Sequence, residues 1–158
     1  MPASLLVRNC SVAWTIDILA DAWSFLVLRE FYMGVRRFDQ IQVALSIPRS
    51  TLSDRLTRLG EARIIKRTTT DARRSEYRLT ERGLDLYLVM LALMRFGDDH
   101  LAGQAPLPLQ LYHQPQGHAF QPMTVCSECR EPIHARDVRY HDGPGAGVSP
   151  APVIPQRR

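Results

Sequence analysis

The stretch FDQIQVALSIPRSTLSDRLTRLG, residues 38–60, decides the fold. Its first part places apolar side chains at helical spacing, at Phe38, Ile41 and Leu45. Pro48 suits the first position of a second helix, which we expect over about 48–62. That helix repeats leucine in a single apolar stripe, at Leu52, Leu56 and Leu59. Two helices joined by so short a turn form a helix-turn-helix unit.

The flanking segments extend this unit on both sides. Two helices are expected before it, over about 12–20 and 23–31, with Asp21 as the cap of the second. Two short extended runs follow it, 64–68 and 75–79, and the polar, basic segment TTDARR joins them as a hairpin, or wing. Thr80 then caps a long helix over about 81–100, which is apolar nearly all round. A surface helix needs only one apolar stripe, so we expect a partner subunit to cover the rest.

The predicted fold class is therefore mainly α with a small β-hairpin (α+β), a winged helix-turn-helix. We place this DNA-binding and dimerisation domain at residues 10–100. Composition changes beyond it, because residues 101–158 hold nine of the eleven prolines and five of the nine glycines. We expect a loop-rich appendage over 101–142 and a disordered tail over 143–158.

The overall composition favours a cytoplasmic protein. The chain has 158 residues, of which 45% are hydrophobic, which is typical of a globular protein with one main domain. Its longest apolar run, Leu86–Met94, is far shorter than the ~20 residues that cross a bilayer. The N-terminus lacks the pattern of a secretory signal. We therefore expect no membrane partner.

Charge is concentrated around the helix-turn-helix unit. Residues 36–82 hold twelve Lys and Arg against six Asp and Glu, a net charge of +6, whereas the whole chain carries +4. A local basic segment predicts a face that binds a polyanion, here double-stranded DNA. The N-terminal part of the second helix would enter the major groove and the hairpin tip would reach the neighbouring groove or backbone. The predicted DNA-binding residues are Arg37, Arg49, Ser50, Thr51, Ser53, Thr57, Arg58, Arg73 and Arg74.

Arg55 lies nearer the apolar stripe of this helix than the residues just named, so it is either a phosphate contact or an internal ion-pair partner.

The sequence shows none of the common catalytic motifs. No phosphate-binding Gly-rich loop, His-Glu-x-x-His or Gly-x-Ser-x-Gly motif is present, so we expect a protein that is not an enzyme.

Six short motifs make the chain similar to the HxlR-type winged helix-turn-helix transcriptional regulators over about residues 10–97. The motifs stand in the family's order and spacing: Cys10-x-Val12-Ala13, Asp21-x-Trp23, Leu26-x-Leu28-Arg29-Glu30, Gly34-x-x-Arg37-Phe38-x-x-Ile41, Thr51-Leu52-Ser53-x-Arg55-Leu56-x-x-Leu59 and Tyr77-x-Leu79-Thr80-x-x-Gly83. The resemblance implies a homodimer that is joined through its first and last helices and binds a pseudo-palindromic operator. The protein would repress or activate nearby genes, and we expect a repressor. It also implies control by a small molecule or an oxidant.

A second hypothesis keeps the same fold but gives it another working surface. The protein would be a small-molecule or thiol-based stress sensor that works through a pocket or through its appendage. An apolar pocket between the first and last helices would be lined by Trp14, Trp23, Phe25, Phe31 and Tyr87, unless these side chains belong to the core. Cys10 matches the near-N-terminal cysteine that some family members use as a redox sensor, although a buried structural role is the alternative.

The appendage carries the pattern His-x4-His-x7-Cys-x2-Cys, formed by His113, His118, Cys126 and Cys129. These four side chains are enough in number for tetrahedral zinc. Gln116 and Arg130 depart from the tails of related regulators, which carry Cys and Gly there. The alternatives are a zinc site and a degenerate ribbon that has lost its ion, and we expect no other cofactor.

Overall fold

The structure is a computed structural model that describes residues 10–19, 21–69, 75–103, 105–141 and 143–144. Contacts divide the chain into two compact parts. The first contains the chain up to Leu86, and the second runs from Tyr87 to His141. Each is described by itself.

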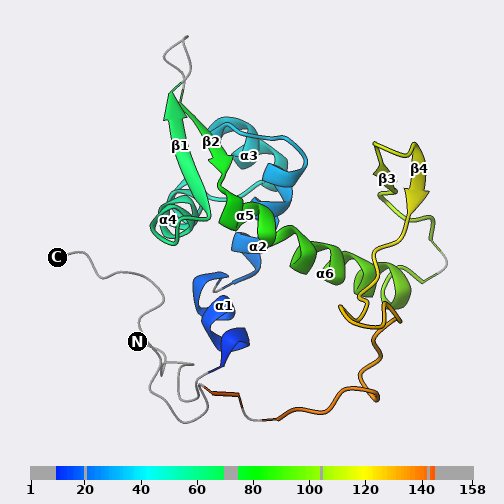
Figure 1. Ribbon diagram of the computed structural model, residues 1–158. Helices are drawn as coiled ribbons and strands as arrows, with labels where there is room; N and C mark the ends of the chain where they lie inside the picture. Colours follow the sequence, from blue (N-terminus) through cyan, green and yellow to red (C-terminus); the bar gives the residue numbers. More distant parts are fainter. Residues whose placement is uncertain (1–9, 20, 70–74, 104, 142, 145–158) are drawn as a thin grey trace. The chain divides into compact units, whose positions relative to one another are not determined.

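Four helices form the body of the first part (Figure 1). They are α1 (Ser11–Leu19), α2 (Ala22–Tyr32), α3 (Phe38–Leu45) and α4 (Arg49–Glu61). Asp21 caps α2 as expected, because its carboxylate accepts a hydrogen bond from the Ser24 N–H at 3.1 Å. The leucine stripe of α4 is buried together with aliphatic side chains from α2, α3 and the segments that follow α3 and α4: Val27, Leu28, Ile41, Ile47 and Ile64.

A two-stranded antiparallel hairpin, β1 (Ile65–Thr69) and β2 (Ser75–Leu79), projects from this body (Figure 1). The Tyr77 N–H donates to the Arg36 carbonyl at 2.8 Å, which fixes β2 to the segment before α3. The short helix α5 (Glu81–Asp85) begins at Thr80, whose hydroxyl accepts from the Gly83 N–H at 3.2 Å. The Thr80 N–H in turn donates to the Ile64 carbonyl at 3.0 Å, at the base of the hairpin.

The second part consists of one helix and a loop-rich segment. Helix α6 spans Tyr87–His100, and the strands β3 (Leu111–His113) and β4 (His118–Phe120) pair antiparallel. An isolated bridge joins Val125 to Pro132. The Arg95 guanidinium on α6 donates to the Pro122 carbonyl at 2.8 Å, which ties the helix to the loops.

The predicted class, mainly helical with a small hairpin, is confirmed. One difference is that the helix expected over 81–100 is interrupted at Leu86, where α5 ends and α6 follows. Helix α6 also packs with the appendage, although the predicted boundary at residue 100 stays a prediction. The tail from residue 145 lies outside the described residues. Within the described part of the chain, no single helix is long and apolar enough to cross a membrane.

Candidate nucleic-acid interface

The turn between α3 and α4 sets the direction of the second helix. Ser46 ends α3 in the left-handed region, with φ at +49°. Ile47 follows and is almost completely buried, so it anchors the turn in the core. Pro48 is extended and stands directly before α4. This three-residue turn is the compact connection that a helix-turn-helix requires.

Helix α4 separates an apolar face from a polar one. Leu52, Leu56 and Leu59 are buried, while the opposite side exposes small and basic side chains, among them Arg49, Ser50, Ser53, Thr57 and Arg58. Thr51 is half-buried beside them. Small hydroxyl-bearing side chains allow a helix to approach base edges closely and to hydrogen-bond them.

The N-terminal end of α4 is suited to a phosphate. Pro48 at the N-cap position makes no side-chain hydrogen bond to the first turn, and the N–H groups of a helix N-terminus suit an anion. The Arg49 guanidinium lies over the Phe38 ring at 4.9 Å from the centroid, which holds this cation at the same end. Arg37, at the start of α3, pairs with the exposed Asp39 carboxylate at 2.9 Å.

Two arginines of α4 have partners inside the protein. The Arg55 Nε lies 2.6 Å from the Asp21 carboxylate, and both side chains are about three-quarters buried. The Nε–H is not aligned for a hydrogen bond, so the contact is an ion pair. This resolves the choice left open for Arg55 in favour of the internal partner. Arg58 is exposed, but it donates to the Asp17 carbonyl of α1 at 3.2 Å.

A groove joins the polar face of α4 to the wing. It encloses about 380 Å³, and its polar lining includes Ser53 and Thr57 from α4 and Arg67 and Tyr77 from the hairpin. The Arg67 side chain is held in place by a hydrogen bond to the Ser75 hydroxyl. The two elements that would face DNA therefore share one continuous surface.

The wing carries cations that are not among the residues predicted from the sequence. Lys66 and Arg78 are exposed and lie opposite each other in the strand register. Like charges directly opposite each other destabilise a hairpin. Arg78 also pairs with the Glu76 carboxylate, 3.5 Å away. The signal that could have found the two cations is the presence of basic residues on both extended runs beside the predicted tip. Arg73 and Arg74, predicted at the tip, lie outside the described residues.

Apolar side chains remain exposed on the helices predicted to dimerise. On α1, Val12 and Ile16 are 65% and 47% exposed. On α6 the exposed apolar side chains are Tyr87, Leu88, Val89, Leu93 and Phe96. An exposed apolar face on a helix is typical of a protein–protein contact.

The predicted zinc donors lie in two separate pairs. His113 and His118 face each other across the β3–β4 hairpin, with ring centroids 5.7 Å apart. Cys126 and Cys129 lie in a later turn, and both are free thiols. Among the residues that the structure describes, no group of three or more His, Cys, Asp or Glu side chains is gathered as a metal site. The described structure leaves these donors as two pairs, and zinc binding by the four together stays a prediction.

The environments of the three cysteines differ. Cys10 is a half-buried free thiol directly before α1. The pKa of Cys126 is lowered, chiefly by the backbone N–H of Cys129, and then by the N–H of Glu128 and the Cys129 thiol. These donors favour the thiolate.

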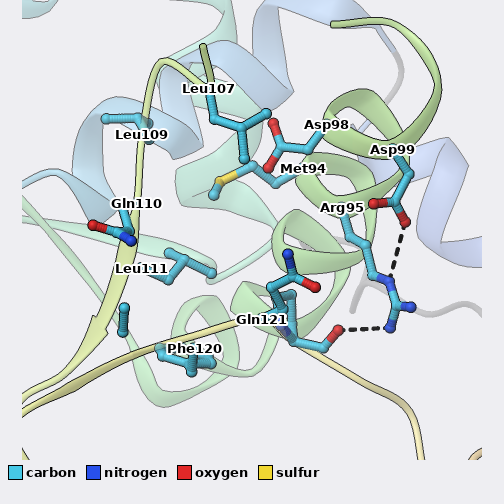
Figure 2. Close-up of a pocket in the computed structure, with 12 residues that line it drawn as sticks. Met94, Arg95, Asp98, Asp99, Leu107, Leu109, Gln110, Leu111, Phe120 and Gln121 are labelled. Carbon is cyan, nitrogen blue, oxygen red and sulfur yellow. Dashed lines mark hydrogen bonds and ion pairs between the residues drawn. The ribbon is translucent and has the colours of Figure 1, made fainter. Parts of the chain in front are cut away.

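A cavity of about 640 Å³ lies between α6 and the β3–β4 segment (Figure 2). Its apolar wall includes Met94, Leu107, Leu111 and Phe120. Figure 2 shows the Asp98 carboxylate beside Met94 and Leu107, while Arg95 turns to Asp99, 3.4 Å away. Of the aromatic residues expected to line a pocket, Phe31 is instead buried against Tyr77 of the wing, with centroids 6.4 Å apart.

Comparison with known proteins decides the family. The family model described as HxlR-like helix-turn-helix matches residues 18–105. The chain belongs to the HxlR family. It is 41% identical over 137 residues to the HTH-type transcriptional regulator Rv3095 of Mycobacterium tuberculosis, covering 85% of this chain and 87% of that protein. It is 38% identical over 95 residues to sll1512 of Synechocystis, another HTH-type transcriptional regulator, covering 58% and 70%.

Solved structures of transcriptional regulators share this fold. PA1607, a proposed transcription factor, superposes with a TM-score of 0.80 at 25% identity, covering 89% of this chain and all of that one. The reduced form of the redox regulator HypR gives 0.51 at 25% identity, covering 57% and 92%. The chain is a transcriptional regulator with the winged helix-turn-helix fold, as the sequence predicts.

Proposed function

We propose that this HxlR-family protein is a homodimeric repressor that binds a pseudo-palindromic operator through two copies of α4 and its wing. The groove shared by Ser53, Thr57 and Arg67 is the observation that carries the proposal. It joins hydroxyl groups that suit base edges to a cation that suits phosphate. A dimer presenting this surface twice would match a two-fold operator, and occupancy of that operator would block transcription.

Replacement of Arg67 by Ala tests this assignment. Loss of a phosphate contact should weaken binding to all DNA sequences, and it should flatten the dependence of log K on log salt by about one unit per contact, hence about two per dimer. The matched control is Arg136→Ala, which removes the same charge from an exposed position in the appendage. Equal salt slopes for the two variants would contradict the proposed interface.

The dimer contact is assigned to the exposed apolar faces of α1 and α6. Covering Leu88, Leu93 and Phe96 with a second copy would remove three large apolar side chains from water. Leu93→Glu should therefore shift the protein from dimer to monomer in sedimentation velocity, while Tyr112→Glu, an exposed position on β3, should not. An unchanged dimer in Leu93→Glu would argue for another interface.

Control by a small molecule is the second part of the proposal, and the cavity beside α6 supports it. Its volume lies in the range of about 300–1,000 Å³ that is common for ligand sites. Small apolar compounds should raise the melting temperature, and Met94→Trp should abolish the shift by filling the space. A sensor that works without DNA would show the thermal shift but no affinity for the DNA upstream of its own gene.

The remaining assignments follow from the role. A regulator of this kind acts in the cytoplasm, where the chromosome lies, and it needs no enzymatic step. Oxidant control through Cys10 is part of the proposal, since the thiol is only half-buried. Cys10→Ser should then bind DNA normally and lose any response to oxidant.

A further inference from the structure

Cys126 and Cys129 stand at the base of a tightly closed turn. The Arg130 N–H donates to the Cys126 carbonyl at 3.0 Å, and the Cys126 N–H donates to the Glu131 carbonyl at 2.9 Å. Below the turn, the Ile133 N–H donates to the Thr124 carbonyl at 3.0 Å, beside the Val125–Pro132 bridge. Arg130 closes the turn in the left-handed region, at φ +64°. These bonds hold a rigid loop around the two cysteines.

The turn brings the two cysteines into one closed loop. Cys129 lies within the segment that is closed by the hydrogen bond from the Arg130 N–H to the Cys126 carbonyl. Cys129 is exposed and Cys126 half-buried, which leaves the pair open to a small reagent. The ends of a tight turn lie within about 7 Å, which overlaps the Cα separation of about 4.4–6.8 Å that a disulfide needs.

The neighbouring groups do not complete a metal site. No third or fourth ligand from the described His, Cys, Asp and Glu side chains joins the two thiols. A tetrahedral zinc site needs four donors, and the two thiols of the turn supply only two of them. What the turn does offer is two adjacent thiols in a geometry that a disulfide can take.

We infer that Cys126 and Cys129 form a thiol–disulfide exchange site that a low-molecular-weight disulfide oxidises to an internal disulfide. The Cys126 thiolate attacks one sulfur of the reagent, forming a mixed disulfide and releasing one thiolate. The Cys129 sulfur, after giving up its proton, attacks the Cys126 sulfur and releases the second thiolate. Two protein thiols lose two electrons and two protons, and the reagent becomes two thiols. This inference does not depend on DNA binding, so its failure would leave the proposed function standing.

The experiment uses the full-length protein and glutathione disulfide as the reagent. After incubation at stepped ratios of disulfide to thiol, acid quenching and alkylation, trypsin separates the cysteines, because residues 96–130 form one peptide and Cys10 falls in residues 9–29. The peptide 96–130 should lose the mass of two hydrogen atoms and carry no alkyl group. In Cys129→Ala the glutathione mixed disulfide should accumulate at least about tenfold over the parent, because no neighbouring thiol resolves it.

A second pair of variants tests the turn while keeping both thiols. Proline cannot reach a positive φ and has no N–H, so Arg130→Pro should open the turn and accumulate the mixed disulfide as Cys129→Ala does. Glycine accepts a positive φ, so Arg130→Gly is the matched control and should form the internal disulfide like the parent. Both variants lose the tryptic site at residue 130, so the peptide that carries the two cysteines is then 96–136.

Three results would overturn the inference. The first is glutathione on both cysteines of the parent with no internal disulfide. The second is an internal disulfide in Arg130→Pro at the same reagent ratio as in the parent. The third is a protein that retains one zinc per chain, with the pair protected from alkylation until a chelator is added.

Discussion

Gly83 is the point where an added methyl group should damage the fold most clearly. A Cβ at this position would lie 2.2 Å from the Ile64 carbonyl oxygen and 3.0 Å from a Leu79 methyl carbon. The carbonyl is part of the backbone at the base of the wing, so it cannot turn aside as a side chain would. Gly83→Ala should therefore destabilise the protein.

The size of the effect follows from the contacts of that carbonyl. The Ile64 oxygen accepts the Thr80 N–H at 3.0 Å and the Thr80 hydroxyl at 3.1 Å. Overpacking costs about 1–3 kcal/mol, and a weakened hydrogen bond adds about 1 kcal/mol. Alanine returns at most about 1 kcal/mol through its higher helix propensity. The net loss should be about 2 kcal/mol in the free energy of unfolding.

Gly60→Ala is the matched control, because nothing lies within 4 Å of a Cβ at that helical position. It should stabilise the protein by about 0.5–1 kcal/mol. Urea unfolding followed by circular dichroism measures both variants, at one protein concentration because a dimer's stability depends on it. Equal stability of the two variants would refute the packing described for Gly83.

Three further predictions concern charge, the wing and the thiols. Asp21→Ala removes both the α2 cap and the partner of Arg55, so it should lower the free energy of unfolding in urea by about 2 kcal/mol. Asp21→Asn keeps an oxygen that can cap α2, so it should lower the free energy of unfolding by less. Equal losses in the two variants would argue against the cap. Arg73→Ala should flatten the salt slope of DNA binding like Arg67→Ala, and an unchanged slope would remove the tip from the interface. The pKa of Cys126 is lowered, so its alkylation by iodoacetamide should begin at lower pH than the alkylation of Cys129. Cys129→Ala should move the pH dependence of Cys126 alkylation to higher pH. The same pH dependence for the two cysteines would contradict the lowered pKa.

Much of the winged helix could be predicted because its signals are local. The spacing of Leu52, Leu56 and Leu59 defines a buried stripe in any helix, and Asp21 and Thr80 cap the helices that follow them. The strands of the hairpin, β1 and β2, follow from two short extended runs on either side of a polar, basic segment. These features depend on neighbours a few residues apart, and sequence displays such neighbours directly.

The proposed DNA-binding surface of α4 and the wing was harder to predict, because it depends on contacts between residues that are distant in sequence. In the sequence, Arg55 looks like the other arginines of α4. Only the folded chain brings it to Asp21, 34 positions earlier. Arg67 lies on a strand, and its place in the groove depends on the packing of the hairpin against α4. The same holds for the candidate zinc donors of the appendage, because their spacing in the sequence does not reveal that they lie in two pairs.

Helix α4 and the wing are proposed to bind a specific DNA sequence. The most direct measurement is fluorescence anisotropy with the DNA upstream of the protein's own gene and with a scrambled duplex, each at two salt concentrations. We expect clear preference for the upstream DNA, with affinity that falls steeply as salt rises. Weak binding that is equal on the two duplexes at both salt concentrations would contradict the account.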